Sequence, residues 1–188
     1  MALDKKVLYQ NLLRTFKGMA GNADFAKGVG DACAQYLELG QVVSEIGSAP
    51  PGSITCDGSL VKATVDPACA TMGTQPPIVI QYTGDEILAT AMSKGLNDMM
   101  NAAQFSGGNI ASATAVFNLK ALHDGILDTF EEMKKKPEEG SESPEPPRDK
   151  DEIMAEGIAG AFTDYLQEGT LTVITTDNPP KSGPGYIL

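Results

Sequence analysis

The pattern that decides the predicted fold runs Phe25-Ala26-Lys27-Gly28-Val29-Gly30-Asp31-Ala32-Cys33-Ala34-Gln35-Tyr36-Leu37-Glu38-Leu39-Gly40. A second stretch repeats it and runs Met154-Ala155-Glu156-Gly157-Ile158-Ala159-Gly160-Ala161-Phe162-Thr163-Asp164-Tyr165-Leu166-Gln167-Glu168-Gly169. Alanine, glycine, an aliphatic residue, alanine, tyrosine, leucine and glycine recur in the same order and at the same spacing. Such self-similarity at a fixed offset indicates an internal repeat.

The similarity extends to the apolar helix expected before each stretch. The matching residues are Leu8, Leu12, Leu13, Thr15, Phe16 and Met19 in the first copy, and Leu122, Ile126, Leu127, Thr129, Phe130 and Met133 in the second. A weaker third match comprises Ala89, Ala91, Met92, Gly95, Met99 and Met100. We interpret the two strong copies as duplicated helical hairpins that pack as a pseudo-twofold pair. Their small residues would let the helices approach closely.

The spacing of apolar residues predicts helices over residues 3–19, 23–39, 85–104, about 110–135 and 151–168. Asp4, Asn22 and Asn109 are the predicted N-caps. The methionine-rich stripe from Met92 to Met100 fits either core packing, which is the commoner use, or an adaptable binding surface.

Between and after the helices, the pattern changes to β-branched runs and loops. Val42–Ile46 and residues 170–176 are predicted strands, which would either pair or be donated to the sheet edge of a partner. We interpret residues 54–83 as an irregular arm with extended pieces at 60–65 and 78–82. Residues 177–185 read as a turn, and the last three residues as an apolar tip.

We therefore predict a mainly α fold with short β segments, built from internally duplicated helical hairpins with extended Pro/Gly-rich arms. The first repeat and its tail occupy residues 1–55. An irregular arm and a Met-rich helix occupy residues 56–109. The second repeat occupies residues 110–188, and contains a Pro/Glu-rich insertion at 137–150 and a C-terminal strand.

The composition limits the classes of function. The formal net charge of the 188 residues is −11, which disfavours binding to a nucleic-acid backbone. The acidity fits a solvated surface that aids solubility, or a negative surface that meets a basic partner. No run of residues approaches the length of a membrane span, and we expect no secretory signal at Met1–Lys6.

No catalytic, cofactor-binding or metal-binding residue is predicted. Three cysteines, Cys33, Cys56 and Cys69, are an odd number, and we expect buried thiols without assigning them a role. His123 lies beside Asp124 in a predicted helix, where adjacent residues do not face each other, so Asp124 should be a poor partner for it.

Other candidate groups also have plain structural explanations. The Gly28-x-Gly30 pair lies inside a predicted helix and lacks the third glycine of a dinucleotide-binding loop. Asp24, Asp31 and Asp164 fall on polar helix faces, which predicts solvated carboxylates rather than an acid–base pair.

One family resemblance follows from the repeat. The pattern Ala-x-Gly-Ile/Val-x-x-Ala-x-x-x-Tyr-Leu-x-x-Gly, followed by a β-branched run and a Pro/Gly tail, is clearest in Gly157–Leu188. It resembles small virion proteins encoded beside the tail and neck genes of tailed bacteriophages. The resemblance implies a tail, neck or baseplate component, made in the host cytoplasm and located in the virion. The three cysteines and the insertion depart from that pattern.

The resemblance leads to a hypothesis of function. We expect a non-enzymatic structural or assembly protein that contacts other virion proteins or copies of itself and takes no small-molecule substrate. The alternative is an acidic regulatory or chaperone-like module that binds a protein partner. An enzyme is the third hypothesis, and it would need a pocket with converging polar groups.

Overall fold

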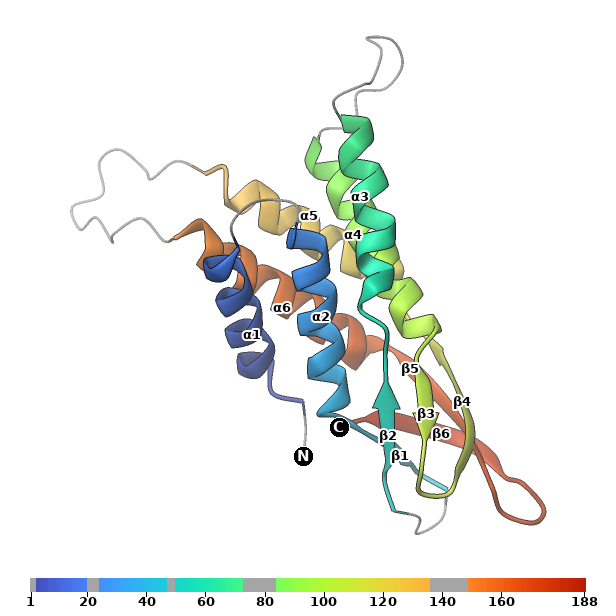
Figure 1. The fold of residues 1–188 in the computed structure, drawn as a ribbon. Coiled ribbons are helices and arrows are strands. Elements are labelled where there is room, and N and C mark those ends of the chain that lie inside the picture. The colour runs from blue at the N-terminus through green and yellow to red at the C-terminus, as the bar shows by residue number, and fades with distance from the viewer. Residues whose placement is uncertain (1–2, 20–23, 47–49, 73–83, 136–148) are drawn as a thin grey trace.

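In the computed structural model, the described residues are 3–19, 24–46, 50–72, 84–135 and 149–188. They form a mixed α/β structure with six helices and six strands (Figure 1). The helices are α1 (Lys5–Gly18), α2 (Phe25–Glu38), α3 (Ser59–Met72), α4 (Gly84–Asn101), α5 (Leu119–Glu132) and α6 (Lys150–Glu168). The strands are β1 (Gln41–Ser44), β2 (Gly52–Thr55), β3 (Gln104–Ser106), β4 (Ile110–Val116), β5 (Thr170–Thr175) and β6 (Ser182–Ile187).

The elements follow one order three times, two helices and then two strands. We call these groups unit 1 (α1, α2, β1, β2), unit 2 (α3, α4, β3, β4) and unit 3 (α5, α6, β5, β6). The second strand of each unit pairs antiparallel with the first strand of the next, as β2 with β3, β4 with β5, and β6 with β1. The helices follow the same rule, since α2 packs on α3, α4 on α5 and α6 on α1.

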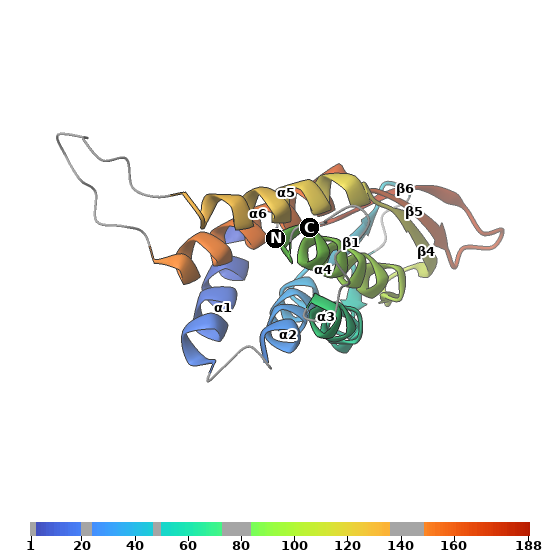
Figure 2. The same ribbon diagram turned by 90° about the horizontal axis from the view of Figure 1, so that it is seen from above.

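The three units therefore close into a ring in place of the predicted pseudo-twofold pair. The sheet order is β3-β2-β1-β6-β5-β4, and the sheet is nearly closed into a barrel. Its two edge strands, β3 and β4, are joined through Gly107 and Gly108, which both have positive φ. Seen from above, the helices lie at one end of the molecule and the strands at the other (Figure 2). The weaker third match of the sequence lies on α4, the second helix of unit 2.

Corresponding positions of the three units supply the core. Val29, Met92 and Ile158 occupy the same place in α2, α4 and α6, and each is fully buried. The first helices contribute Leu8, Val61 and Leu122, and one turn later Leu12, Val65 and Ile126, all buried. The recurring residues of the sequence are thus the residues that bury the apolar helix faces against one another.

A small residue lets the two helices of units 1 and 3 approach closely. A Cβ atom added to Gly28 would lie 2.3 Å from Thr15 Cγ2, and one added to Gly157 would lie 2.1 Å from Thr129 Oγ1. Unit 2 carries alanine at both corresponding positions, Ala68 and Ala91. Units 1 and 3 therefore place a threonine next to a glycine where unit 2 has two alanines. Both pairs keep the combined side-chain volume small between the two helices of the unit.

The first departure from the predicted elements is α3, which replaces the irregular arm expected there. β-branched residues between Leu60 and Val65 favoured an extended piece. In the structure, Asp57 accepts a hydrogen bond from Ser59 N at the start of this helix. Val61 and Val65, one helical turn apart, are buried. The predicted piece at 78–82 lies outside the described residues.

Two more elements differ from the prediction. Residues 110–116 form β4 instead of the start of a helix, and α5 begins at Leu119 after Asn118, whose side chain accepts from Ala121 N. Ser182–Ile187 form β6 instead of a turn and an apolar tip. The two predicted strand tails do not pair with each other, because β6 lies between β1 and β5.

The other predicted elements are confirmed, with shorter bounds in most cases. They are α1, α2, α4, α6, β1 and β5, and Asp4 caps α1 by accepting from Lys6 N. Asn22 and residues 137–148 of the insertion lie outside the described residues. Among the described residues, no helix is both long and apolar enough to cross a bilayer.

One more set of corresponding residues lies in the second helices. Tyr36, Met99 and Tyr165 occupy the same position in the three units, and all are buried. Tyr165 Oη donates to Asn97 Oδ1 of α4 at 2.8 Å. The position in α6 of unit 3 that corresponds to Asn97 of unit 2 is Thr163. Thr163 lies next to Tyr36 of unit 1, as Asn97 lies next to Tyr165 of unit 3.

The shorter threonine changes that contact. Tyr36 Oη and Thr163 Oγ1 are both buried, and neither has a hydrogen-bond partner among the described residues. Both residues line a cavity of about 80 Å³. Burial raises the pKa of Tyr36.

We predict that Gly157→Ala lowers the free energy of unfolding by about 1–3 kcal/mol, because the new methyl group overlaps Thr129. Thr129→Ala in the same chain should recover most of that loss, because the pair then matches Ala68 and Ala91 of unit 2. Urea denaturation of the two single variants and the double variant gives the coupling free energy. Purely additive effects would contradict the packing argument.

We also predict that Tyr165→Phe destabilises the protein by about 1 kcal/mol, because it leaves Asn97 without its donor. Tyr36→Phe should cost less, because its hydroxyl has no partner among the described residues. Thr163→Asn should stabilise the protein by about 1 kcal/mol by supplying the acceptor that Asn97 supplies to Tyr165. Equal losses for the two Tyr→Phe variants in urea denaturation would refute this comparison.

Candidate interaction surfaces

Charge is divided unevenly between the helices and the sheet. None of the residues in the six described strands is Asp, Glu, Lys or Arg, although these residues make up 21% of the chain. In the part of the chain that the structure describes, the helices and the connecting segments therefore carry all of the charged side chains. The exposed strand residues are Gln41, Ser53, Thr55, Gln104, Ser106, Ala111, Ser112, Thr114, Val116, Thr170, Thr172, Ile174, Ser182, Pro184 and Tyr186.

The outer face of β4, β5 and β6 is a continuous part of this neutral surface. Cross-strand register places Thr114, Thr172 and Pro184 in one row. Three large apolar side chains are exposed on the same strands, Val116 at 67%, Ile174 at 40% and Tyr186 at 43% of their surface. On the opposite face of β5, the alternate residues Leu171, Val173 and Thr175 are buried. We call the outer face of β4, β5 and β6 the neutral sheet face.

A polar network at the far end of the barrel ties two turns together. Asn109 Nδ2 donates to Asp177 Oδ1 at 2.7 Å, and Thr175 Oγ1 donates to Asp177 Oδ2 at 3.0 Å. Thr176 N donates to Asn109 O at 3.0 Å. Hydrogen bonds from Asn109 and Thr175 hold the pKa of Asp177 below its usual value. Asn109, a predicted N-cap, instead joins the β3–β4 turn to the β5–β6 connection.

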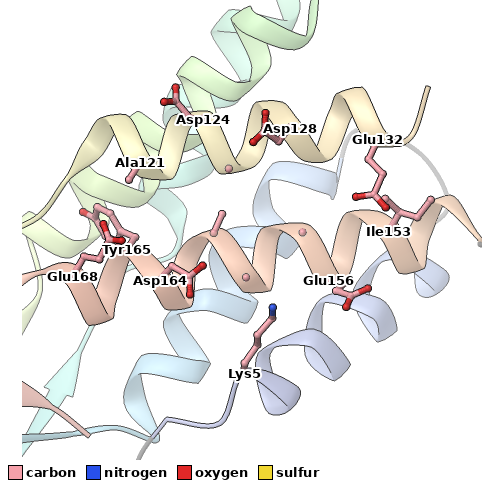
Figure 3. A pocket seen from close by; sticks show the side chains of 14 residues that line it. Lys5, Ala121, Asp124, Asp128, Glu132, Ile153, Glu156, Asp164, Tyr165 and Glu168 are labelled. Carbon is pink, nitrogen blue, oxygen red and sulfur yellow. The ribbon is translucent and has the colours of Figure 1, made fainter. Parts of the chain in front are cut away.

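The second candidate surface is an open groove of about 540 Å³ along α5 and α6, next to Lys5 of α1. Glycine and alanine residues line its floor, among them Gly125, Gly157 and Gly160. Six carboxylates border it: Asp124, Asp128, Glu132, Glu156, Asp164 and Glu168. Figure 3 shows these side chains spread along the two helices, with the Lys5 ammonium near the middle of α6. The groove is an extended acidic surface.

His123 and Asp124 contradict one expectation from the sequence. Their side chains do interact, since His123 Nδ1 lies 3.0 Å from Asp124 Oδ1. Hydrogen bonds from Lys120 and His123 lower the pKa of Asp124. The pair is at the helix surface, and it borders the acidic groove through Asp124 alone.

The remaining candidate residues are spread over the structure. Asp24 and Asp164 are exposed, and Asp31 forms an ion pair with Lys27, as expected for polar helix faces. Gly28 and Gly30 lie inside α2, where a phosphate-binding loop is not possible. The methionine stripe packs in the core, since Met92, Met99 and Met100 are buried. This confirms the core interpretation of those residues.

The three cysteines differ in exposure, so the expectation of buried thiols holds only in part. Cys33 is buried, Cys56 is half-buried and Cys69 is exposed. Burial raises the pKa of the Cys33 thiol well above its usual range and raises that of Cys56 to about 11. Among the described residues, no group of His, Cys, Asp and Glu is arranged to hold a metal ion.

Comparisons with known proteins add no family to this description. No family model, no curated protein and no solved structure matches the chain.

Sequence reasoning missed the neutral sheet face, because it did not recognise β4 and β6 as strands. The alternation of Ser and Thr with Ala in residues 111–115, with no charge among them, was the available signal.

We predict that Asp177→Ala lowers the melting temperature at pH 7, because it removes the acceptor for Asn109 and Thr175. The pKa of Asp177 is depressed in the folded protein, so its contribution is present above its unfolded pKa of about 3.9 and is lost as the pH falls through the folded value. The difference from wild type should therefore shrink below about pH 4. Thermal scans from pH 7 to pH 3 measure it. Asp128→Ala on the exposed face of α5 is the control, and a pH-independent difference for Asp177→Ala would contradict the network.

Proposed function

We propose that the protein is a non-enzymatic structural or assembly component of a phage virion, located in its tail, neck or baseplate. The observation that supports this best is the neutral sheet face on a protein of net charge −11. Edge strands of soluble proteins commonly carry lysine or other charges that prevent pairing with another sheet, and the edge strand β4 carries none. A surface depleted of charge and bearing exposed Val, Ile and Tyr side chains is suited to burial against another protein.

The repeated unit supports the same proposal. We infer that the helical hairpins arose by internal duplication. In this proposal the Gly/Ala-rich helices α2 and α6, which carry the resemblance to virion proteins, help to form the ring, and the strands contact neighbouring proteins in the particle. The interactions expected for such a component are with other virion proteins or with copies of the same chain. Oligomerisation within a larger assembly follows from this proposal.

The acidic groove favours a second candidate function. Six carboxylates along α5 and α6 provide an extended negative surface that could attract a basic segment of another protein. In that case the protein would be an acidic regulatory or chaperone-like module. Its complexes would weaken as the salt concentration rises, because salt screens the attraction.

The two candidates differ in copy number within particles. For a structural component, quantitative mass spectrometry of purified particles from the source should find the chain at a fixed ratio to other virion proteins. A regulator would instead remain in the fraction that does not sediment and would be substoichiometric. Absence of the chain from purified particles would overturn the proposal of a virion component.

A further inference from the structure

We propose that the cavity at the junction of units 3 and 1 is an internal water site, in which ordered water bridges Tyr36 Oη of α2 and Thr163 Oγ1 of α6. The other residues that line this cavity are Leu3, Leu166, Gln167 and Ile187. The inference does not depend on the proposed virion function, because it concerns the interior of the chain and not its protein partners.

Two buried hydroxyl groups carry the argument. Tyr36 is 0% and Thr163 is 5% exposed. Neither Tyr36 Oη nor Thr163 Oγ1 has a hydrogen-bond partner among the described residues. A buried hydroxyl without a hydrogen bond destabilises the folded state, and most buried polar groups in native proteins have a protein or water partner. A water molecule accepts a hydrogen bond from one hydroxyl and donates one to the other, which satisfies both groups at once.

The volume of the cavity selects water among possible ligands. A site for one water molecule needs roughly 10–15 Å³ of such space, whereas pockets for cofactors or drug-sized molecules measure about 300–1,000 Å³. The cavity of about 80 Å³ therefore accommodates one or a few water molecules and is too small for a cofactor. Water reaches it from the rim, where Gln167 is exposed and Leu3 and Ile187 are half-buried.

A third polar side chain also lines the cavity. Gln167 follows Thr163 by one helical turn, so that both residues lie on the same face of α6. Its amide carries both hydrogen-bond donors and an acceptor. The site thus offers two hydroxyls and one amide, and internal waters typically make about three hydrogen bonds. Cavities that stay dry are instead lined by apolar side chains.

The corresponding positions at the other two junctions show the alternatives to water. At the junction of units 2 and 3, Asn97 reaches Tyr165, and the two form a direct hydrogen bond of 2.8 Å. At the junction of units 1 and 2, the corresponding residues are Ala34 and Met99, which are buried and carry no hydroxyl or amide group in their side chains. The junction of units 3 and 1 keeps a polar pair but has the shorter Thr163, so that water takes the place of the missing amide.

A high-resolution crystal structure of the wild-type chain is the first test. We expect density for at least one water molecule within hydrogen-bond distance of both Tyr36 Oη and Thr163 Oγ1. A direct hydrogen bond between the two hydroxyls, a different molecule in the cavity, or a cavity without ordered water would overturn the proposal. This test does not depend on whether any variant folds.

Oxygen-17 magnetic relaxation dispersion counts the long-lived internal waters in solution. Thr163→Asn supplies the amide that Asn97 supplies to Tyr165, so it should remove at least one of these waters. Thr172→Asn is the matched control, because it makes the same chemical change at an exposed position of β5 and should leave the count unchanged. A count that falls in both variants, or in neither, would overturn the water site.

A double-mutant cycle in urea tests the bridge through its effect on stability. Tyr36→Phe and Thr163→Val each remove one hydroxyl and change the side-chain volume little. With a bridging water, each variant should lower the ratio of folded to unfolded protein by about two- to threefold, the lower end of the range for one hydrogen bond. The double variant should lose less than the two effects combined, because both substitutions disrupt the same bridge.

Two dry hydroxyls would give the opposite result. Removing a buried polar group that has no partner leaves the stability equal or higher. Single variants at least as stable as the wild type, or independent effects of the two substitutions, would therefore overturn the water site. None of these measurements involves another protein, so their outcome is distinct from the copy number that tests the virion proposal.

Discussion

Closure of the ring is the constraint on which the rest of the structure depends. A unit of two helices and two strands exposes an apolar helix face and two strand edges, and it is too small to bury either alone. Each unit covers the edge and the face of the next, through β2–β3 and α2–α3, β4–β5 and α4–α5, and β6–β1 and α6–α1. The buried positions recur because every junction needs the same faces. Tyr165 with Asn97, and Tyr36 with Thr163, are two versions of one such junction.

The nearly closed sheet also separates two chemical surfaces. Alternation along β5 sends Leu171, Val173 and Thr175 into the barrel and Thr170, Thr172 and Ile174 outward. Of the inward residues, Leu171 and Val173 are apolar, and the Thr175 hydroxyl donates a hydrogen bond to Asp177. The stability of the folded chain alone would allow lysine or glutamate at the outward positions of β5. Small hydroxyl and aliphatic side chains stand there instead, while the helices carry the acidic charge. The contrast between the two ends of the molecule therefore calls for an explanation in terms of contacts made by the sheet.

The sequence predicts the parts of the fold whose periodicity is local. Leu8, Leu12 and Phe16 repeat at helical spacing on a face that is buried, so α1 could be recognised without its neighbours. Distant residues decide the elements that were missed. Gly95 of α4 allows α3 to pack closely against α4, since a Cβ atom added to Gly95 would lie 2.8 Å from Val61 Cα. β6 contains two glycines and a proline, which indicate a turn, and it is a strand because β1 and β5 pair with it on both sides. The neutral sheet face was hidden for the same reason, because it is assembled from β4, β5 and β6.

The junction of the first and last units has a consequence for connectivity. Gly40 lies beside both ends of the described chain, since a Cβ atom there would be 3.2 Å from Leu3 Cδ2 and 3.2 Å from Leu188 O. Gln41 and Leu188 exchange two backbone hydrogen bonds of 2.8 Å. Units 1 and 2 are joined covalently by residues 56–58, and units 2 and 3 by residues 117 and 118, whereas units 3 and 1 meet through hydrogen bonds and packing. The ring thus has two peptide-linked junctions and one open junction of the same kind. A circularly permuted chain, linked across residues 3 and 188 and cut at either covalent junction, would preserve every contact between units.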